Sequence, residues 1–291
     1  MNELQAIQNI SAAPRMTNVN TDAALYTMWL NGLSAASKRT YTSGLEEFRS
    51  YTDKPLNQIT VEDLQGYENE LQDKGLRPAS VAIRIAAVKS LLSYGQKIGY
   101  LQYNVGTALR TVKVQDELSE RILSQEDVLK IIALESNQRD HAILAFLYDT
   151  GLRVSELCGL RWKHFHTDGG KTVMTVHGKG GKTRYIPLTK KQYDMLRAQA
   201  KDTSPESPVF FSQKGGPLDV SAVRRIVYAA AAKAGVPHVS PHWFRHAHAT
   251  HALKKGCPIN IVQATLGHSS LQVTSRYTHI DSSEGSSLYF D

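Results

Sequence analysis

The strongest constraint on the fold is a set of basic and nucleophilic residues that suit one chemical task but lie far apart in the chain. The members of this set are Arg153, Lys179, His242, Arg245, His268 and Tyr277. A phosphodiester gathers negative charge on its non-bridging oxygens as a nucleophile enters, and a planar guanidinium group can bind two such oxygens at once. If these residues act together, the fold has to bring several separate segments to one place.

Each residue type has a role in cleaving a phosphodiester without a metal. Tyr277 can attack phosphorus and form a covalent intermediate. Lys179 can protonate the departing alkoxide, which contributes about a hundred- to ten-thousand-fold in rate, and Lys182 is the alternative acid. His242 and His268 can donate hydrogen bonds to the phosphate or relay the tyrosine proton.

The sequence around Arg153 predicts that this residue opens a helix. An apolar helical run over residues 142–148 precedes it, and Gly151 allows the chain to turn. Glu156 lies three residues later, within reach of the arginine. A structural ion pair with Glu156 is therefore the alternative explanation of Arg153.

Two further segments have clear local patterns. Residues 173–177 and 183–188 have strand composition and flank a glycine-rich turn, so Lys179 is predicted at the tip of a hairpin. His242 and Arg245 are spaced i, i+3 and share one face of a helix. These two side chains can therefore bind one phosphate together.

The chain is predicted to bend between His268 and Tyr277. A helix over residues 258–266 would stop at Gly267, and a serine at position 269 or 270 would cap a short new helix that leads to the tyrosine. The bend would let both side chains face one site. A helix-capping role is the alternative explanation of His268.

In order and spacing, these residues resemble the catalytic set of the tyrosine recombinases (phage integrase family), and the chain is most similar to the compact, Xer-like members. The similarity extends over about residues 21–280. It implies that the six residues named first are catalytic and that Glu156 is their supporting acidic residue. The stretch 246–251 is richer in histidine than the corresponding helix of relatives, which is usually more apolar.

The resemblance implies a mainly α-helical fold with a small β-sheet, arranged as a two-domain DNA clamp. Helix caps at Thr21, Ser34 and Thr60 and a proline at position 78 predict four helices in the first part of the chain. The expected parts are a flexible N-terminal arm (1–20), a helical, SAM-like core-binding domain (21–109), a linker (110–123), a catalytic domain (124–280) and a C-terminal tail (281–291).

The activity implied by the resemblance is site-specific recombination of double-stranded DNA. Tyr277 would cleave a strand to give a 3′-phosphotyrosine and a free 5′-hydroxyl, and a partner strand would reverse the step through a Holliday junction. A homo-tetramer on two synapsed sites would exchange C-terminal tails, which here end in the apolar residues 288–290. The chemistry requires no metal, ATP or other cofactor. Two alternatives stay open, which are a type IB topoisomerase that relaxes DNA and a non-catalytic DNA-binding architectural protein.

The distribution of charge agrees with nucleic-acid binding. The net charge is +7, and residues 121–291 hold 22 basic and 14 acidic side chains, so the excess belongs to the segment with the catalytic candidates. Residues 21–109 hold nine of each sign, and a solvated surface is the alternative to DNA contact there. The candidate DNA-binding residues are Lys38, Arg39, Arg77, Arg84 and, in the hairpin, Lys182.

Other functional classes fit the sequence less well. The three histidines within 246–251 are not spaced as helical zinc ligands, so no metal site is expected. Gly181 and Lys182 resemble the end of a phosphate-binding loop, but that pattern needs a glycine where Val176 stands. The two cysteines are widely separated, and neither a signal peptide nor an apolar run of about 18 residues is present. A cytoplasmic location without membrane contact is expected.

Overall fold

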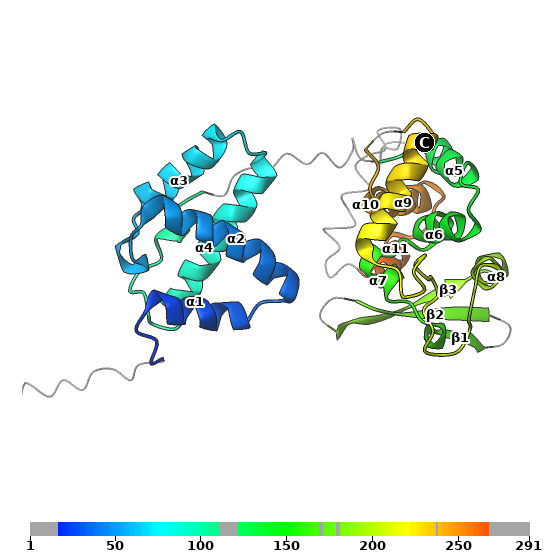
Figure 1. The fold of residues 1–291 in the computed structure, drawn as a ribbon, viewed down its shortest axis with the longest axis horizontal. Coiled ribbons are helices and arrows are strands. Elements are labelled where there is room, and N and C mark those ends of the chain that lie inside the picture. The colour runs from blue at the N-terminus through cyan, green and yellow to red at the C-terminus, as the bar shows by residue number, and fades with distance from the viewer. Residues whose placement is uncertain (1–16, 111–121, 169–170, 179–180, 237, 268–291) are drawn as a thin grey trace, which may run out of the picture. The chain divides into compact units, whose positions relative to one another are not determined.

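The structure is a computed structural model that describes residues 17–110, 122–168, 171–178, 181–236 and 238–267 (Figure 1). The chain divides into two compact units, Met1–Asp116 and Glu117–Asp291. The expectation of a mainly helical fold with a small sheet is confirmed. None of the described helices is long and apolar enough to cross a membrane.

The four helices of the first unit begin where the sequence predicts them. Thr21, Ser34 and Thr60 each accept a hydrogen bond from the backbone N–H three residues later, which satisfies an otherwise unpaired donor of the first helical turn. The last helix starts with a proline at its first position. The helices are α1 (Asp22–Asn31), α2 (Ala35–Thr52), α3 (Val61–Asp73) and α4 (Pro78–Lys97).

Helix α4 is the centre of the first unit, because α1, α2 and α3 all contact it. Its buried residues include Val81, Ile85 and Val88, which face Leu25 and Tyr67 within one apolar cluster. The Tyr67 hydroxyl, which is fully buried, donates a hydrogen bond to the Gly44 carbonyl (3.1 Å). This bond joins α3 to α2 within the core.

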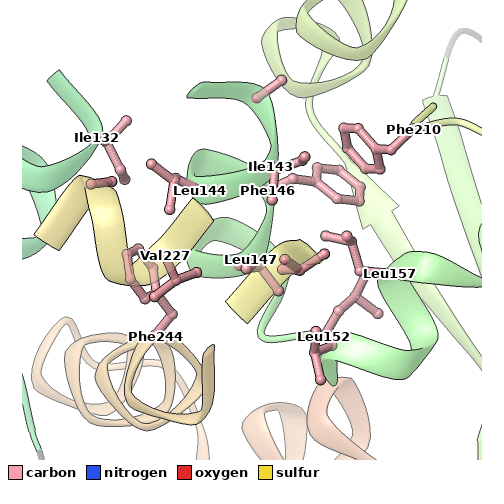
Figure 2. Close-up of a cluster of buried hydrophobic side chains, with 14 of the residues drawn as sticks. Ile132, Ile143, Leu144, Phe146, Leu147, Leu152, Leu157, Phe210, Val227 and Phe244 are labelled. Carbon is pink, nitrogen blue, oxygen red and sulfur yellow. The ribbon is translucent and has the colours of Figure 1, made fainter. Parts of the chain in front are cut away.

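The second unit is built around helix α6, which contacts α5, α8, α9 and α10 (Figure 1). Figure 2 shows Phe146 and Leu147 of α6 in a cluster with Phe210, Val227 and Phe244. The helices of this unit are α5 (Gln125–Ala133), α6 (Gln138–Thr150), α7 (Val154–Cys158), α8 (Lys190–Ala198), α9 (Val220–Lys233), α10 (Pro241–Lys254) and α11 (Ile259–Leu266).

A three-stranded antiparallel sheet in the order β1-β2-β3 completes the second unit. The strands are β1 (Phe165–Asp168), β2 (Lys171–His177) and β3 (Thr183–Leu188). The predicted hairpin is confirmed, since His177 pairs with Thr183 and the Gly178 N–H donates to the Lys182 carbonyl at 2.7 Å. Side chains alternate across a strand, so Arg184 shares the inward face of β3 with the buried Ile186 and Leu188.

Strand β1 and helices α8 and α9 were not predicted from the sequence. Strand β1 has only four residues and pairs with β2 alone, so it carries too little periodicity to be recognised. Helix α9 contains an alanine-rich run, which favours a helix. The packing of α9 against the neighbouring helices of the second unit becomes visible only in the structure.

Candidate active site

The backbone around Arg153 is fixed by burial on both sides. Helix α6 ends at Gly151 in a left-handed conformation (φ 59°), and the Gly151 N–H donates to the Leu147 carbonyl at 3.1 Å. Leu152 and Leu157 are both buried. Arg153 is therefore held as the N-cap residue of α7, while its side chain remains one-third exposed. The prediction that Arg153 opens a helix is confirmed.

Glu156 is the centre of a group of four charge-assisted hydrogen bonds. It accepts from the backbone N–H of Arg153 (2.8 Å) and from Arg153 Nη1 (2.9 Å). It also accepts from Arg184 Nη1 (3.0 Å) and Nη2 (2.7 Å), so each carboxylate oxygen receives two donors. Burial acts to raise the pKa of Glu156, but the bonds and charges of Arg184 and Arg153 outweigh it and hold this pKa below its usual value.

Arg245 joins α10 to the C-terminal ends of α6 and α11. This residue of α10 is only 4% exposed. Its Nη1 donates to the Gly151 carbonyl (2.5 Å) and its Nη2 to the Leu266 carbonyl (2.6 Å). Terminal carbonyls of a helix have no partner within the helix, and here an arginine supplies the donors. The guanidinium group is thereby fixed beside the turn that carries Arg153.

His242 lies one turn before Arg245 on α10. Partial burial lowers its pKa first, and the positive charges of Arg245, Arg224 and Arg153 lower it further. The imidazole is therefore mostly neutral at pH 7, so it can accept a proton or donate a hydrogen bond. The structure thus gathers three predicted site residues from two segments, Arg153 from the turn before α7 and His242 and Arg245 from α10.

Two basic residues of this region were not predicted from the sequence. Arg184 of β3 binds Glu156 directly, and the available signal was a charged residue at an inward position of an amphipathic strand. Arg224 of α9 is exposed, and its charge acts on His242. No local signal set Arg224 apart from the other arginines of the chain.

Three predicted catalytic residues, Lys179, His268 and Tyr277, lie outside the described residues, as does the tail 281–291. The residues directly before these segments are described. Gly178 precedes Lys179, and Gly267, which ends α11 in a left-handed conformation (φ 66°), precedes His268. The predicted helix over 258–266 and its glycine stop are confirmed, and Lys182 is exposed in the hairpin.

The candidate DNA-binding residues of the first unit differ in their surroundings. Arg39 and Arg77 are exposed, and Lys38 is half-buried near the start of α2. Arg84 is paired with Glu47 (Nε to Oε2, 2.7 Å), which joins α4 to α2. A structural role of Arg84 is thus visible, and DNA contact by all four remains a prediction.

The histidines of α10 have protein partners. His248 Nδ1 lies 2.7 Å from the Tyr148 carbonyl, and His251 Nδ1 lies 2.9 Å from the Tyr148 hydroxyl. Both histidines therefore join α10 to α6. Within the described ranges, no group of three or more histidine, cysteine, aspartate or glutamate residues is placed to hold a metal ion.

Comparison with known proteins decides the family. The profile described as Phage integrase family matches residues 121–284, and the one described as Phage integrase, N-terminal SAM-like domain, matches residues 26–97. The chain belongs to the phage integrase family. The expectation of a tyrosine recombinase is confirmed by curated relatives that carry that name.

Two such relatives are both called tyrosine recombinase XerC. The protein of Thermodesulfovibrio yellowstonii is 32% identical, over 86% of this chain and 87% of its own length. That of Corynebacterium efficiens is 35% identical, over 92% and 88%. This similarity extends over both units.

Solved structures share the fold. XerH recombinase bound to a palindromic difH substrate in a post-cleavage complex has a TM-score of 0.72 at 22% identity, covering 91% of this chain and 83% of its own. A lambda integrase tetramer bound to a Holliday junction also has a TM-score of 0.72 at 22% identity, covering 95% and 80%. At these identities the likeness concerns the fold.

A substitution at Gly151 tests how tightly the site is packed. A Cβ at this position would lie 2.7 Å from Leu266 Cδ2 and 2.8 Å from His248 Cδ2. Gly151→Ala should combine about 1–2 kcal/mol for a left-handed backbone with about 1–3 kcal/mol for overpacking. Gly256→Ala is the matched control, because Gly256 also has positive φ (81°) but no atom within 4 Å of a Cβ. Equal losses in chemical denaturation would contradict the crowding argument.

The charge of Glu156 makes the second unit sensitive to acid. Its folded pKa is lowered, so its contribution to the free energy of unfolding is complete above its ordinary pKa of 4.5 and is lost as the pH falls through the folded value. Glu156→Gln should cost about 3–5 kcal/mol at pH 7, because Arg184 is left buried without its partner. The difference from the unchanged protein should shrink on titration below pH 4.5.

Glu206→Gln is the control for this titration, since Glu206 is paired with Lys163 on the surface (2.9 Å). It should leave the unfolding midpoint nearly unchanged at pH 7. A Glu156→Gln penalty that stays constant as the pH is lowered would show that the carboxylate charge is not responsible.

Proposed function

We propose that this recombinase cleaves and rejoins double-stranded DNA with Tyr277 as the nucleophile and Arg153, His242 and Arg245 as ligands of the scissile phosphate. The observation that supports this best is the convergence of these three residues from the turn after α6 and from α10. A phosphate placed there would meet two guanidinium groups fixed by protein contacts. Such fixed donors need little reorganisation when negative charge builds up on the non-bridging oxygens of the phosphate.

The proposed step is an exchange of one phosphodiester for another. The Tyr277 oxygen attacks phosphorus, the bond from phosphorus to the 5′-oxygen breaks, and a 3′-phosphotyrosine forms. The phenol proton passes to His268 or His242, and Lys179 gives a proton to the departing 5′-oxygen. Attack by the 5′-hydroxyl of a partner strand reverses these transfers. No step requires a metal or another cofactor.

The proposed assembly has four protomers on two synapsed DNA sites, with a Holliday junction between the two strand exchanges. The lambda integrase structure described above is a tetramer on such a junction, which supports this arrangement. The C-terminal tail, residues 281–291, would dock on a neighbouring protomer through its apolar end. Lys38, Arg39, Arg77 and Arg84 would contact DNA from the first unit. A cytoplasmic location is part of the proposal.

The two alternative functions are less well supported. The relatives with 31–36% identity are named tyrosine recombinases, and none of those described above is named a topoisomerase. An architectural protein would need no ordered cluster of Arg153, Glu156 and Arg245 at one turn. The buried, fully bonded Glu156 is more readily understood as support for catalysis.

Loss of the nucleophile gives the first test. DNA retained covalently by the unchanged protein is sequenced, and a nicked suicide duplex of that sequence is prepared. Tyr277→Phe should abolish the covalent adduct while the dissociation constant for the same duplex changes by less than about threefold, since no basic contact is lost. Tyr185→Phe, at an exposed tyrosine of β3, is the control and should still form the adduct. An adduct with Tyr277→Phe would assign the nucleophile to another residue.

The acid is tested with a substrate whose 5′-oxygen is replaced by sulfur. A thiolate leaves with little need of protonation, because thiols are far more acidic than alcohols. Lys179→Ala should therefore cleave normal DNA at least about a hundredfold more slowly and recover most of that loss on the sulfur substrate. Lys182→Ala is the comparison, with a similar defect expected on both substrates. Recovery of Lys182→Ala alone would make Lys182 the acid.

A further inference from the structure

Arg184 connects three elements of the second unit through one guanidinium group. It lies on β3, and its side chain is 10% exposed. Two of its nitrogens bind the two carboxylate oxygens of Glu156 on α7, at 3.0 and 2.7 Å. Its Nε donates to the Thr265 carbonyl of α11 at 2.7 Å. The fork thus fixes both the distance and the orientation between these elements.

The carboxylate that Arg184 holds is the one that orients Arg153. Glu156 accepts from the Arg153 backbone and from its guanidinium group. Without Arg184, the carboxylate would keep only contacts from its own helix turn, and several rotamers of both side chains would become available. Arg184 therefore acts on Arg153 through Glu156.

The segments that carry Lys179, His268 and Tyr277 begin beside the pair of Arg184 and Glu156. A Cβ on Gly178 would lie 3.6 Å from Arg184 Nη1 and 3.7 Å from Glu156 Oε1. A Cβ on Gly267 would lie 3.1 Å from Arg184 Cδ. The chain leaves Gly178 toward Lys179 and leaves Gly267 toward His268 and Tyr277. Both glycines therefore lie close beside the Arg184 side chain.

Two arginines hold successive carbonyls at the end of α11. Arg184 binds the carbonyl of Thr265, and Arg245 binds that of Leu266. These groups belong to the last turn, whose carbonyls lack partners within the helix. The exit of the nucleophile-bearing segment is therefore set by the same side chains that order the phosphate site.

We propose that Arg184 is a positioning residue for strand cleavage, which sets Arg153 through Glu156 and fixes the points from which the acid and nucleophile segments leave. This inference rests on the proposed function. All three nitrogens of Arg184 donate to Glu156 or Thr265, so the proposal gives this residue no direct bond to the phosphate. A buried ion pair alone is weak evidence for stability, since desolvation of the charges offsets their attraction.

The experiment compares Arg184→Lys and Arg184→Gln with the same two substitutions at Arg139. Arg139 is partly buried in the first turn of α6, where it binds Asp140 (2.6 Å) and the Phe211 carbonyl (3.0 Å), at the opposite end of that helix from Gly151. Like Arg184, it is a partly buried arginine that binds a carboxylate and a backbone carbonyl, but it lies away from the site. Single-turnover formation of the covalent adduct is measured at a temperature at which all variants are folded.

Arg184→Lys and Arg184→Gln should cleave about a hundredfold more slowly, the size of effect that a misplacement of about 1 Å produces. Lysine keeps the charge but cannot form the fork, so it should not restore the rate. Their dissociation constants for the DNA site should change by less than about threefold. Both Arg139 variants should lose comparable stability and retain the rate of the unchanged protein.

A methylphosphonate at the scissile position separates positioning of Arg153 from a purely structural role of Arg184. If Arg184 only stabilises the fold, the cleavage defect of its variants should be the same on this substrate as on normal DNA. The methylphosphonate removes the negative charge that Arg153 is proposed to bind, so the defect of Arg184→Lys should fall to less than about tenfold, as should that of Arg153→Ala. Adding Arg184→Lys to Glu156→Gln should cause little further loss on normal DNA. An equal defect of Arg184→Lys on normal DNA and on the methylphosphonate would overturn the inference. It would also be overturned if Arg184→Lys cleaved normal DNA as fast as Arg139→Lys.

The two proposals fail differently. If the unchanged protein forms no adduct, or if Tyr277→Phe still forms it, the proposed function is wrong. If the unchanged protein cleaves through Tyr277 and the Arg184 variants match the Arg139 variants, only the positioning role is wrong. Should Arg184→Gln not fold, Arg184→Lys alone carries the comparison, because its charge still neutralises Glu156.

Discussion

The second unit depends on one buried carboxylate shared by two arginines. Glu156 is 5% exposed and receives four donors, two from its own turn and two from β3. Burying an unpaired carboxylate would be prohibitively costly, so the positions of α7 and β3 are coupled to each other. Arg245 lies against the turn that precedes α7, through its bond to the Gly151 carbonyl.

Left-handed glycines make this close arrangement possible. Gly151 and Gly267 end α6 and α11, and each lies where a side chain would meet a neighbouring one. Glycine adopts positive φ without steric cost, so both helices stop abruptly and expose their last carbonyls. Arg245 binds one carbonyl at each of these ends. Arg245, a proposed phosphate ligand, is thus also part of the framework of the fold.

Local signals in the sequence predicted much of this fold. The caps at Thr21, Ser34 and Thr60 each combine a side-chain oxygen with a nearby backbone donor, so a few residues contain all the information needed. The hairpin and the stop at Gly267 are of the same kind. The partner of Arg184 lies 28 positions away on another element, and no local pattern contains such a contact. Arg224 is near His242 only because α9 packs beside α10, which required the complete core.

The two arginine bonds at the end of α11 also have a mechanical meaning. The carbonyls of Thr265 and Leu266 are the last ones of the helix, and each is attached to a different part of the second unit through a guanidinium group. Tension applied to the chain beyond Gly267 is therefore borne by β3 and α10 together, and it reaches Glu156 through Arg184. Because Arg184 also binds Glu156, a force applied there acts on the residue that holds the Arg153 guanidinium group.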